Sequence, residues 1–395
     1  MATASEDRHA VRRARVGVTA AFAAHAVLSG LLGPWIPRIK ARAGLDASGL
    51  GIALSGFAVG LLLGTRVADP AIRRWGGRRI VRGGIPTMGV GFALLPAVRS
   101  LLSLTLLFLG IGLLAGLIDV AMNIEAVAVE RRFGRRVMSA IHGMWSVALF
   151  VGAALASVGI AAGLSIGTHL PISVALVVIV SAAFLRWLPD PEEAEREAAA
   201  GAWVERQEEP SVGRSISPRV LLLCLVAGGS FLVEGIAVEW SAVFLRESVG
   251  ADPSAAGVGV VAFSAGMALS RFLGDRLVAR FGQPTVARVG AAGAFVALAT
   301  MVVVHRLVPS VVAFGIVGLG LGPVVPLAFR AAGWTDRPGH ASALPLVVTA
   351  GYVGSIVGPM LVGSIADLVT LRIAFLVPVI ASALSALAAG ATRER

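Results

Sequence analysis

"GIALSGFAVGLLLGTRVADPAIRRWGGRRIVRGG", residues 51–84, returns in altered form as "GVGVVAFSAGMALSRFLGDRLVARFGQPTVARVG", residues 257–290. The two stretches align without gaps at an offset of 206 residues (257 − 51 = 206). Nine of the 34 positions are identical, where roughly three are expected by chance in so glycine-rich a chain. A repeat of about half the chain predicts two structurally equivalent halves around a central path.

The composition surrounding this repeat is that of a membrane protein. Of the 395 residues 56% are apolar and only 14% are charged, and the mean hydropathy is +0.85. A soluble chain of this length needs far more polar surface. Runs of about 20 apolar residues, which cross a hydrocarbon core roughly 30 Å thick, recur along the chain. They predict twelve spans, near 15–37, 48–68, 80–98, 101–128, 138–163, 168–188, 219–244, 254–274, 284–304, 308–329, 341–366 and 370–390.

All twelve spans are expected to be helices, because lipid cannot satisfy the polar groups of an open backbone. The sequence therefore predicts an all-α integral membrane protein with two six-helix halves. Between spans six and seven, residues 189–218 are polar, mixed in charge and bounded by prolines. We expect an N-terminal half at 1–188, a cytoplasmic linker at 189–218 and a C-terminal half at 219–395.

The net charge of +11 can suggest nucleic acid, but the distribution of the basic residues argues against such a partner. With the N-terminus placed inside, 27 of the 34 Lys and Arg residues fall on the cytoplasmic side (34 − 7 = 27). The seven in outer loops are Arg38, Lys40, Arg42, Arg99, Arg246, Arg306 and Arg372. This positive-inside bias predicts a multi-pass protein of the bacterial cytoplasmic membrane with both termini in the cytoplasm.

Several other kinds of site are not encoded. The single cysteine, Cys224, lies in a predicted span and excludes an internal disulfide or a cysteine-rich metal site. Basic residues precede the first apolar stretch, as in a signal peptide. That stretch runs to about residue 37, however, so we expect an uncleaved first helix. No Walker loop supplies ATP drive. We expect no cofactor, no metal and no enzymatic activity.

The loops after the second and eighth spans resemble the signature of the major facilitator superfamily, roughly Gly-x-x-x-Asp-Arg/Lys-x-Gly-Arg-Arg/Lys. The first copy departs from it, because the Gly64 to Asp69 spacing is one residue longer and Pro70 follows the acid. The resemblance implies a transporter whose spans 1, 4, 7 and 10 line a central cavity. It also implies that the acids of both loops contact a helix N-terminus of the opposite half. The expected cytoplasmic gating residues are Asp69, Arg74, Arg78, Asp275, Arg276 and Arg280.

A finer resemblance points to a bacterial branch with fucose-permease-like members. It is carried by "DVAMN" (119–123), "IHGMWS" (141–146), "EWSAVFL" (239–245), "GLGLGPVVP" (318–326) and "GYVGSIVGPMLVG" (351–363). This branch does not name a substrate. Independently of the resemblance, Pro323 and Pro326 predict a kink in the tenth span.

The fourth span holds an acid where burial is costly. Asp119 and Asn123, four residues apart, share one helix face. His25 in the first span is expected at the same depth, roughly 14 Å from the cytoplasmic end. A His25–Asp119 pair can carry a proton, since imidazole titrates near neutral pH and a desolvated carboxylate shifts upward. The alternative is a static hydrogen-bonded pair that fixes helix packing.

Two further spans carry candidate site residues. His142 begins the fifth span, with Trp145 and Ser146 on its face. It can gate the cytoplasmic mouth or simply bond across helices. In the seventh span, Glu234 is a candidate for a substrate or proton site.

The outer ends of two spans are expected to face the membrane interface. Trp35 and Trp240 sit at matching outer ends, where aromatic residues usually anchor a protein. Glu239, beside Trp240, is expected at the surface.

These features favour a secondary transporter that moves a small organic solute by alternating access, coupled to protons. The direction is open, since uptake fits the fucose-permease resemblance and export of drug-like or secondary metabolites fits a sparse cavity. A non-transporting sensor needs a soluble output domain, and an intramembrane enzyme needs a nucleophile–base pair; the sequence shows neither. The expected partners are a small-molecule substrate, protons and the lipid bilayer, with the chain acting as a monomer.

Overall fold

The computed structural model describes residues 4–133, 138–189, 216–333 and 343–393. In the first six spans the helices are α1 (Ala4–Leu32), η1 (Gly33–Trp35), α2 (Ile36–Ala43), α3 (Ala47–Trp75), α4 (Gly77–Leu94), η2 (Leu95–Ala97), α5 (Leu101–Phe133), α6 (Met138–Ala161) and α7 (Ile166–Leu185). The last six spans comprise α9 (Pro218–Val243), η3 (Phe244–Ser248), α10 (Val258–Phe281), α11 (Gln283–Val304), α12 (Leu307–Leu321), α13 (Val324–Gly333), α14 (Ala343–Leu368), α15 (Leu371–Ala374), α16 (Leu376–Ala388) and η4 (Ala389–Thr392).

The prediction of twelve membrane-spanning helices is confirmed. The described residues form 12 helical runs that are long and apolar enough to cross a bilayer. The break in the tenth span is confirmed too, because α12 ends at Leu321 and α13 begins at Val324, on either side of Pro323. Most of the expected linker, residues 190–215, lies outside the described part of the chain.

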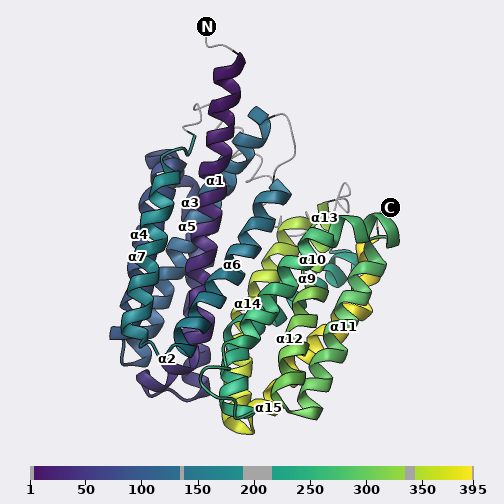
Figure 1. Cartoon of the computed structure of the whole chain (residues 1–395). Coiled ribbons are helices and arrows are strands. Elements are labelled where there is room, and N and C mark those ends of the chain that lie inside the picture. Colours follow the sequence, from purple (N-terminus) through teal and green to yellow (C-terminus); the bar gives the residue numbers. More distant parts are fainter. Residues whose placement is uncertain (1–3, 134–137, 190–215, 334–342, 394–395) are drawn as a thin grey trace.

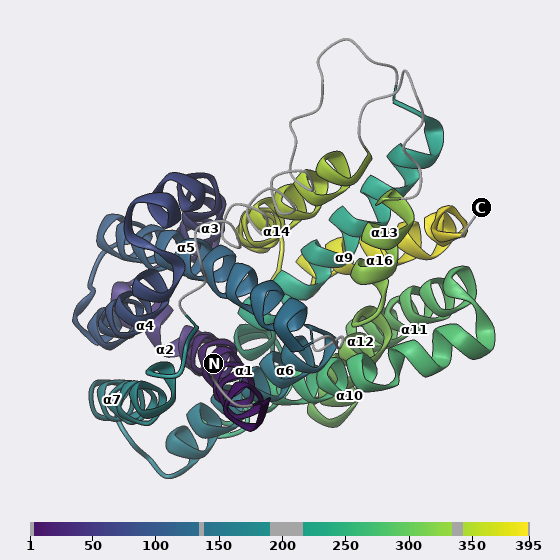
Figure 2. The ribbon, with the colours of Figure 1, turned by 90° about the horizontal axis from the view of Figure 1, so that it is seen from above.

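The same helix pairing occurs in the first six spans and in the last six. α3 packs on α5, α1 on α6 and α4 on α7; correspondingly, α10 packs on α12, α9 on α14 and α11 on α16. Figures 1 and 2 show the two groups side by side, coloured from purple to teal and from teal-green to yellow. We call them the N-terminal and C-terminal halves.

Two glycines show how closely this pairing repeats. A Cβ atom placed on Gly112 of α5 would lie 2.0 Å from the carbonyl oxygen of Phe57 in α3. A Cβ atom on Gly318 of α12 would lie 2.0 Å from the carbonyl oxygen of Phe263 in α10. Both pairs are related by the 206-residue offset (112 + 206 = 318; 57 + 206 = 263). Direct backbone contact, which only glycine permits here, therefore extends the repeat beyond the aligned stretch.

The turns repeat as well. Gly44 and Gly250 have φ of 64° and 77°, and Gly76 and Gly282 have φ of 80° and 79°. These values lie in the left-handed region that favours glycine. Each pair again differs by 206 in number, so the chain turns into its second, third, eighth and ninth spans in matching ways.

Three expectations about the outer ends of the spans are wrong. Trp35 and Trp240 are fully buried and do not anchor the protein at the interface. The break in the helix at Gly33–Trp35 turns Trp35 inward, where its Nε1 donates to Nδ1 of His169 in α7 at 3.3 Å. Oε2 of Glu239 is also buried, without a hydrogen-bond partner among the described residues.

Both described chain ends lie at one end of the bundle, which we call the terminus side; the opposite end is the far side. The halves touch through α3 with α14 and through α6 with α10. Further contacts join η1 and α2 to α9 and η1 to α10, so side chains on all of these elements set how the halves fit together.

Candidate functional site

Arg271, near the middle of α10, reaches from the C-terminal half to the N-terminal half. Its Nη1 donates a hydrogen bond of 2.7 Å to Oγ of Ser146 in α6. Its guanidinium carbon lies 5.8 Å from the ring centre of Trp145, one residue earlier in α6. A charged group this deep in a span is costly, so it marks a candidate functional site.

The two histidines predicted from the sequence lie on the N-terminal side of Arg271. Nε1 of Trp145 donates to Nδ1 of His25 at 3.3 Å, and Nε2 of His25 is buried without a hydrogen-bond partner among the described residues. His142 packs edge-on against Phe22, with ring centres 5.2 Å apart. The charge of Arg271 acts on His142 as well.

Glu234 of α9, in the same half as Arg271, is near enough to interact with it electrostatically. The two charges interact, but no nitrogen of Arg271 comes within 4.0 Å of the carboxylate. Among the described residues Glu234 accepts no hydrogen bond, and its side chain is partly exposed. The carboxylate is therefore open to water, a proton or a ligand.

Asp119 and Asn123 face each other as their spacing predicts. Nδ2 of Asn123 donates to the carbonyl oxygen of Asp119 at 2.8 Å and to its Oδ1 at 3.3 Å. Tyr352 of α14, in the opposite half, is near enough to interact electrostatically with Asp119. Asp119 therefore also lies where the two halves meet.

The structure gives His25 and Asp119 different partners. His25 bonds to Trp145 and Asp119 to Asn123, and no ion pair within 4.0 Å joins the two among the described residues. The proposed direct pair is therefore not formed. The polar residues divide instead into a pair at Asp119 and a cluster around Arg271, which sequence reasoning missed.

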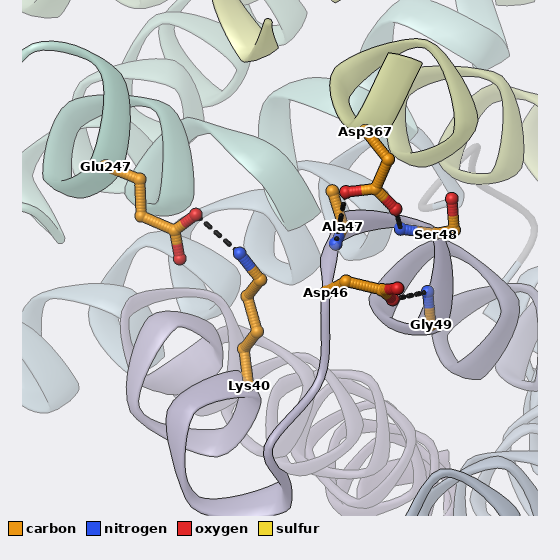
Figure 3. A network of polar contacts seen from close by, with 7 residues as sticks. All are labelled: Lys40, Asp46, Ala47, Ser48, Gly49, Glu247 and Asp367. Carbon is orange, nitrogen blue, oxygen red and sulfur yellow. Dashed lines mark hydrogen bonds and ion pairs between the residues drawn. The ribbon is translucent and has the colours of Figure 1, made fainter. Parts of the chain in front are cut away.

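The far side is closed by two contacts between the halves, drawn in Figure 3. Nζ of Lys40 in α2 lies 2.5 Å from Oε2 of Glu247 in η3. Asp367, at the end of α14, accepts hydrogen bonds from the backbone amides of Ala47 and Ser48 at 3.0 and 2.6 Å. A carboxylate at a helix N-terminus is stabilised by the unpaired amides and the helix dipole.

From the Asp367 contact toward the middle of the spans, the backbones of α3 and α14 touch directly. A Cβ on Gly363 would lie 2.4 Å from the carbonyl oxygen of Ala47, and one on Gly51 would lie 2.6 Å from that of Pro359. Oγ of Ser55 donates to the carbonyl oxygen of Ile356 at 3.0 Å. The glycine- and proline-containing stretch 351–363 thus forms the seam with the N-terminal half.

An apolar groove of about 650 Å³ between α11 and α12 lies apart from these polar residues. Its lining consists of aliphatic side chains, proline, glycine and a single threonine. Such a surface suits lipid tails and offers nothing to orient a polar solute.

Comparison with known proteins identifies the family. The model of the Major Facilitator Superfamily matches residues 18–244 and 221–394, which together cover nearly the whole chain. The protein belongs to the major facilitator superfamily. It is an MFS-type transporter and a multi-pass integral membrane protein.

Two bacterial relatives are similar over most of their length. An uncharacterised MFS-type transporter of Yersinia pestis is 33% identical over 347 residues, covering 87% of this chain and 86% of that protein. The uncharacterised transporter y4wD of Sinorhizobium fredii is 30% identical over 381 residues, covering 96% and 98%. Neither name includes a substrate.

Solved structures share the fold. The nucleoside transporter NupG superposes with a TM-score of 0.68 at 15% identity, over 98% of this chain and 100% of that one. A bacterial homologue of the human lysosomal transporter Spinster, in an inward-facing and occupied conformation, gives a TM-score of 0.68 at 14% identity, over 96% and 97%. At this identity the likeness concerns the fold alone.

The superfamily signature loops lie on the terminus side. Asp69 forms an ion pair with Arg73, one turn along α3, and the guanidinium of Arg74 lies 6.0 Å from the ring centre of Trp75. In the second copy Asp275 and Arg276 are exposed, and Arg280 packs on its neighbour Phe281 with 5.3 Å from guanidinium carbon to ring centre. Arg78 has interactions within the structure as well.

The expected contacts of Asp69 and Asp275 with the opposite half fall beside undescribed residues. The first turns of α6 and α14 follow residues 134–137 and 334–342, which lie outside the described part of the chain. The gating role of these loops therefore stays a prediction.

Proposed function

We propose that this MFS-type transporter moves a small organic solute by alternating access and couples the movement to protons. The observation that carries the proposal is the position of Arg271, Glu234 and Asp119. All three lie within spans: Arg271 bonds to Ser146 of the opposite half, Asp119 interacts with Tyr352 of the opposite half, and Glu234 interacts with Arg271. Ionisable groups placed inside a membrane and open to both halves are the expected parts of a solute and proton path.

The contacts between the halves support alternating access. Asp367 and Lys40 tie the halves together on the far side, while Asp69 on the terminus side is paired within its own helix. With the terminus side placed in the cytoplasm, as the basic loops favour, the far-side contacts are those that an inward-facing state would make. The outward-opening state would release the far-side contacts and engage the signature loops.

Two carboxylates support proton coupling. Asp119 and Glu234 come from different halves, and neither forms an ion pair within 4.0 Å among the described residues. A carboxylate whose surroundings change between conformations binds a proton with different affinity in each, which coupling requires. His25 and His142 are further proton-accepting groups in the same region.

The substrate is a small organic solute, and the finer resemblance to fucose-permease-like members makes sugars and their derivatives the first compounds to test. The direction of transport stays open between uptake and export. Both directions use the same site and the same coupling residues. The assay below therefore measures coupling first and direction second.

The test uses proteoliposomes loaded with a pH-sensitive dye and exposed to a panel of neutral, anionic and cationic solutes. A co-transported or exchanged solute is expected to change the internal pH in proteoliposomes but not in protein-free liposomes. The double variant Asp119→Asn/Glu234→Gln should lose this signal. Uptake of a labelled solute with no pH change would contradict proton coupling, and no protein-dependent uptake of any solute would contradict transport.

Asp252→Asn provides the matched control. Asp252 lies in the loop before α10, where Ser254 donates to it through both its hydroxyl and its amide. These hydrogen bonds lower the pKa of Asp252, so it stays ionised across the pH range of the assay. Its replacement removes one negative charge outside the spans and should leave the dye signal intact.

A further inference from the structure

Most of the hydrogen-bonding capacity of Arg271 is unused. A guanidinium group has five N–H donors. Among the described residues Arg271 makes one side-chain hydrogen bond, to Ser146, and no ion pair within 4.0 Å. The side chain is partly exposed. The N–H groups not used by Ser146 therefore remain accessible at the boundary between the halves.

A charge in this position normally has an opposite charge in contact with it. A cation inside a span is costly, and a carboxylate in contact offsets much of that cost. Here the acid that acts on Arg271, Glu234, does so only from beyond 4.0 Å. The planar fork of a guanidinium matches the two oxygens of a carboxylate, with two parallel hydrogen bonds.

We propose that Arg271 binds the carboxylate of an organic monoanion, and that the transported solute belongs to this class. This inference rests on the proposed transport function and gives its site a ligand chemistry. The carboxylate would complete the coordination of Arg271 at the place where α10 meets α6, so the ligand sits at the boundary between the halves. The hydrogen bond to Ser146 fixes the orientation of the guanidinium.

The surroundings favour a single negative charge and an apolar body. Glu234 would repel the second charge of a phosphate monoester. The ring of Trp145 lies beside the guanidinium. One turn from Glu234 on α9, Phe231 lies 6.1 Å from Phe329 and 6.3 Å from Tyr352 between ring centres. The ring of Trp145 offers apolar surface to the part of the ligand next to its carboxylate.

The test measures binding of matched pairs to purified full-length protein: benzoate with benzamide and phenylacetate with phenylacetamide, with phenyl phosphate alongside. We expect a carboxylate to raise the unfolding temperature and to change tryptophan fluorescence through Trp145. The uncharged amide should bind at least tenfold more weakly, and phenyl phosphate more weakly than benzoate. Arg271→Lys, which keeps the charge but not the fork, should lose at least tenfold in affinity, and Arg271→Gln should lose binding.

Arg306→Gln is the matched control, since Arg306 is exposed on the far side and its loss changes the net charge equally. It should bind as the wild type does. If Arg271→Gln does not fold, the proposal is tested by the affinity of Arg271→Lys and by the comparison of each acid with its amide on the wild-type protein. Equal binding of acids and amides, binding untouched in Arg271→Lys, or no carboxylate binding at all would overturn the proposal.

The dye assay separates this inference from the transport function. Coupled transport of an uncharged solute by the wild type and by Arg271→Gln would leave the transport function standing and overturn only the substrate class. Absence of any protein-dependent transport would instead overturn the function itself.

Discussion

Asp367 accepts a hydrogen bond from the backbone amide of Ser48 at 2.6 Å, joining residues 319 positions apart in the sequence. The acid ends α14 and the amide begins α3, so one helix caps the other across the boundary between the halves. The same turn of α3 is capped from within by Asp46, which accepts from the amide of Gly49 at 2.7 Å. The N-terminus of α3 is thus held by one carboxylate from each half.

Asp367→Asn should weaken closure of the far side. An exposed carboxylate at a helix N-terminus contributes about 0.3–1 kcal/mol, so its loss should shift the equilibrium roughly 2- to 5-fold toward opening. Double electron–electron resonance can measure the distance between spin labels at positions 99 and 306, one on each half, in a Cys224→Ser background. Asp367→Asn should show a larger population of long distances. Asp46→Asn removes the same charge from a contact made within one half, keeps an oxygen that can accept from Gly49, and should leave the distance distribution unchanged.

The Lys40–Glu247 ion pair should make a contribution of similar size to that of the Asp367 cap. The side chains are 12% and 38% exposed, and pairs near the surface are worth about 0.2–1 kcal/mol and are screened by salt. Lys40→Glu alone should favour far-side opening, and the swap Lys40→Glu/Glu247→Lys should restore the wild-type distances at low salt. A swap that behaves like the single variant would show that the pair does not hold the halves together.

Gly112→Ala should destabilise the protein, whereas Gly110→Ala should not. The added methyl group at position 112 would meet the carbonyl oxygen of Phe57, while nothing lies within 4 Å of the Cβ position at Gly110 in the same helix. Forcing an extra carbon into a packed contact costs about 1–3 kcal/mol. Thermal unfolding in detergent should show a lower midpoint for Gly112→Ala. Equal midpoints for the two variants would refute the backbone contact between α3 and α5.

Asp119→Asn should uncouple transport from the proton gradient. The replacement preserves the shape and the hydrogen bond with Asn123 but removes the titrating group. In proteoliposomes it should abolish accumulation driven by a pH gradient while leaving counterflow exchange largely intact. His25→Ala should shift the pH dependence without abolishing transport. Accumulation at the wild-type level in Asp119→Asn would assign Asp119 to packing and make Glu234 the next candidate.

Asp69→Asn and Asp275→Asn should each make the terminus side open more often. If these acids close that side by contacting helix N-termini of the opposite half, their loss should favour its opening by about 0.3–1 kcal/mol. A reporter cysteine on the terminus side, in the Cys224→Ser background, should react faster with a water-soluble maleimide in either variant. Unchanged reaction rates in both would remove the signature loops from the gate.

The sequence predicted the fold well because its signals are long and repeated. Twelve apolar runs are each about long enough to cross a bilayer, and the 206-residue offset predicted two equivalent sets of helices. Gly60 and Gly266, identical in the alignment, make the same close approach: a Cβ would lie 2.1 Å from the carbonyl oxygen of Leu109 and 2.2 Å from that of Gly315. Helical periodicity and the spacing of glycines depend only on residues that are close in the sequence, so they can be recognised in a single sequence without a structure.

The candidate site was only partly predicted. Spacing on one helix placed Asp119 beside Asn123, and the face shared by Trp145 and Ser146 contacts Arg271. Arg271 stands only four residues before Asp275, so in the sequence it is easily taken for one of the basic residues of the signature loop. Its position inside the eighth predicted span was the signal that could have identified it.

Contacts between the halves could not be predicted. Whether His25 meets Asp119 or Trp145 depends on helix rotations that periodicity leaves undetermined. Asp367 likewise contacts Ser48 only because α14 and α3 cross, and no spacing rule connects residues 319 positions apart.

The seam between α3 and α14 has a consequence for electrical insulation. Its contacts, at Gly51, Gly363 and Ser48, act over such short distances that separation by one water molecule, about 2.8 Å across, removes all of them together. A half-open seam therefore keeps almost none of the stabilisation of a closed one. The far side therefore opens in one step, with few partly open conformations. Such conformations could hold a continuous chain of water molecules that lets ions leak down their gradient.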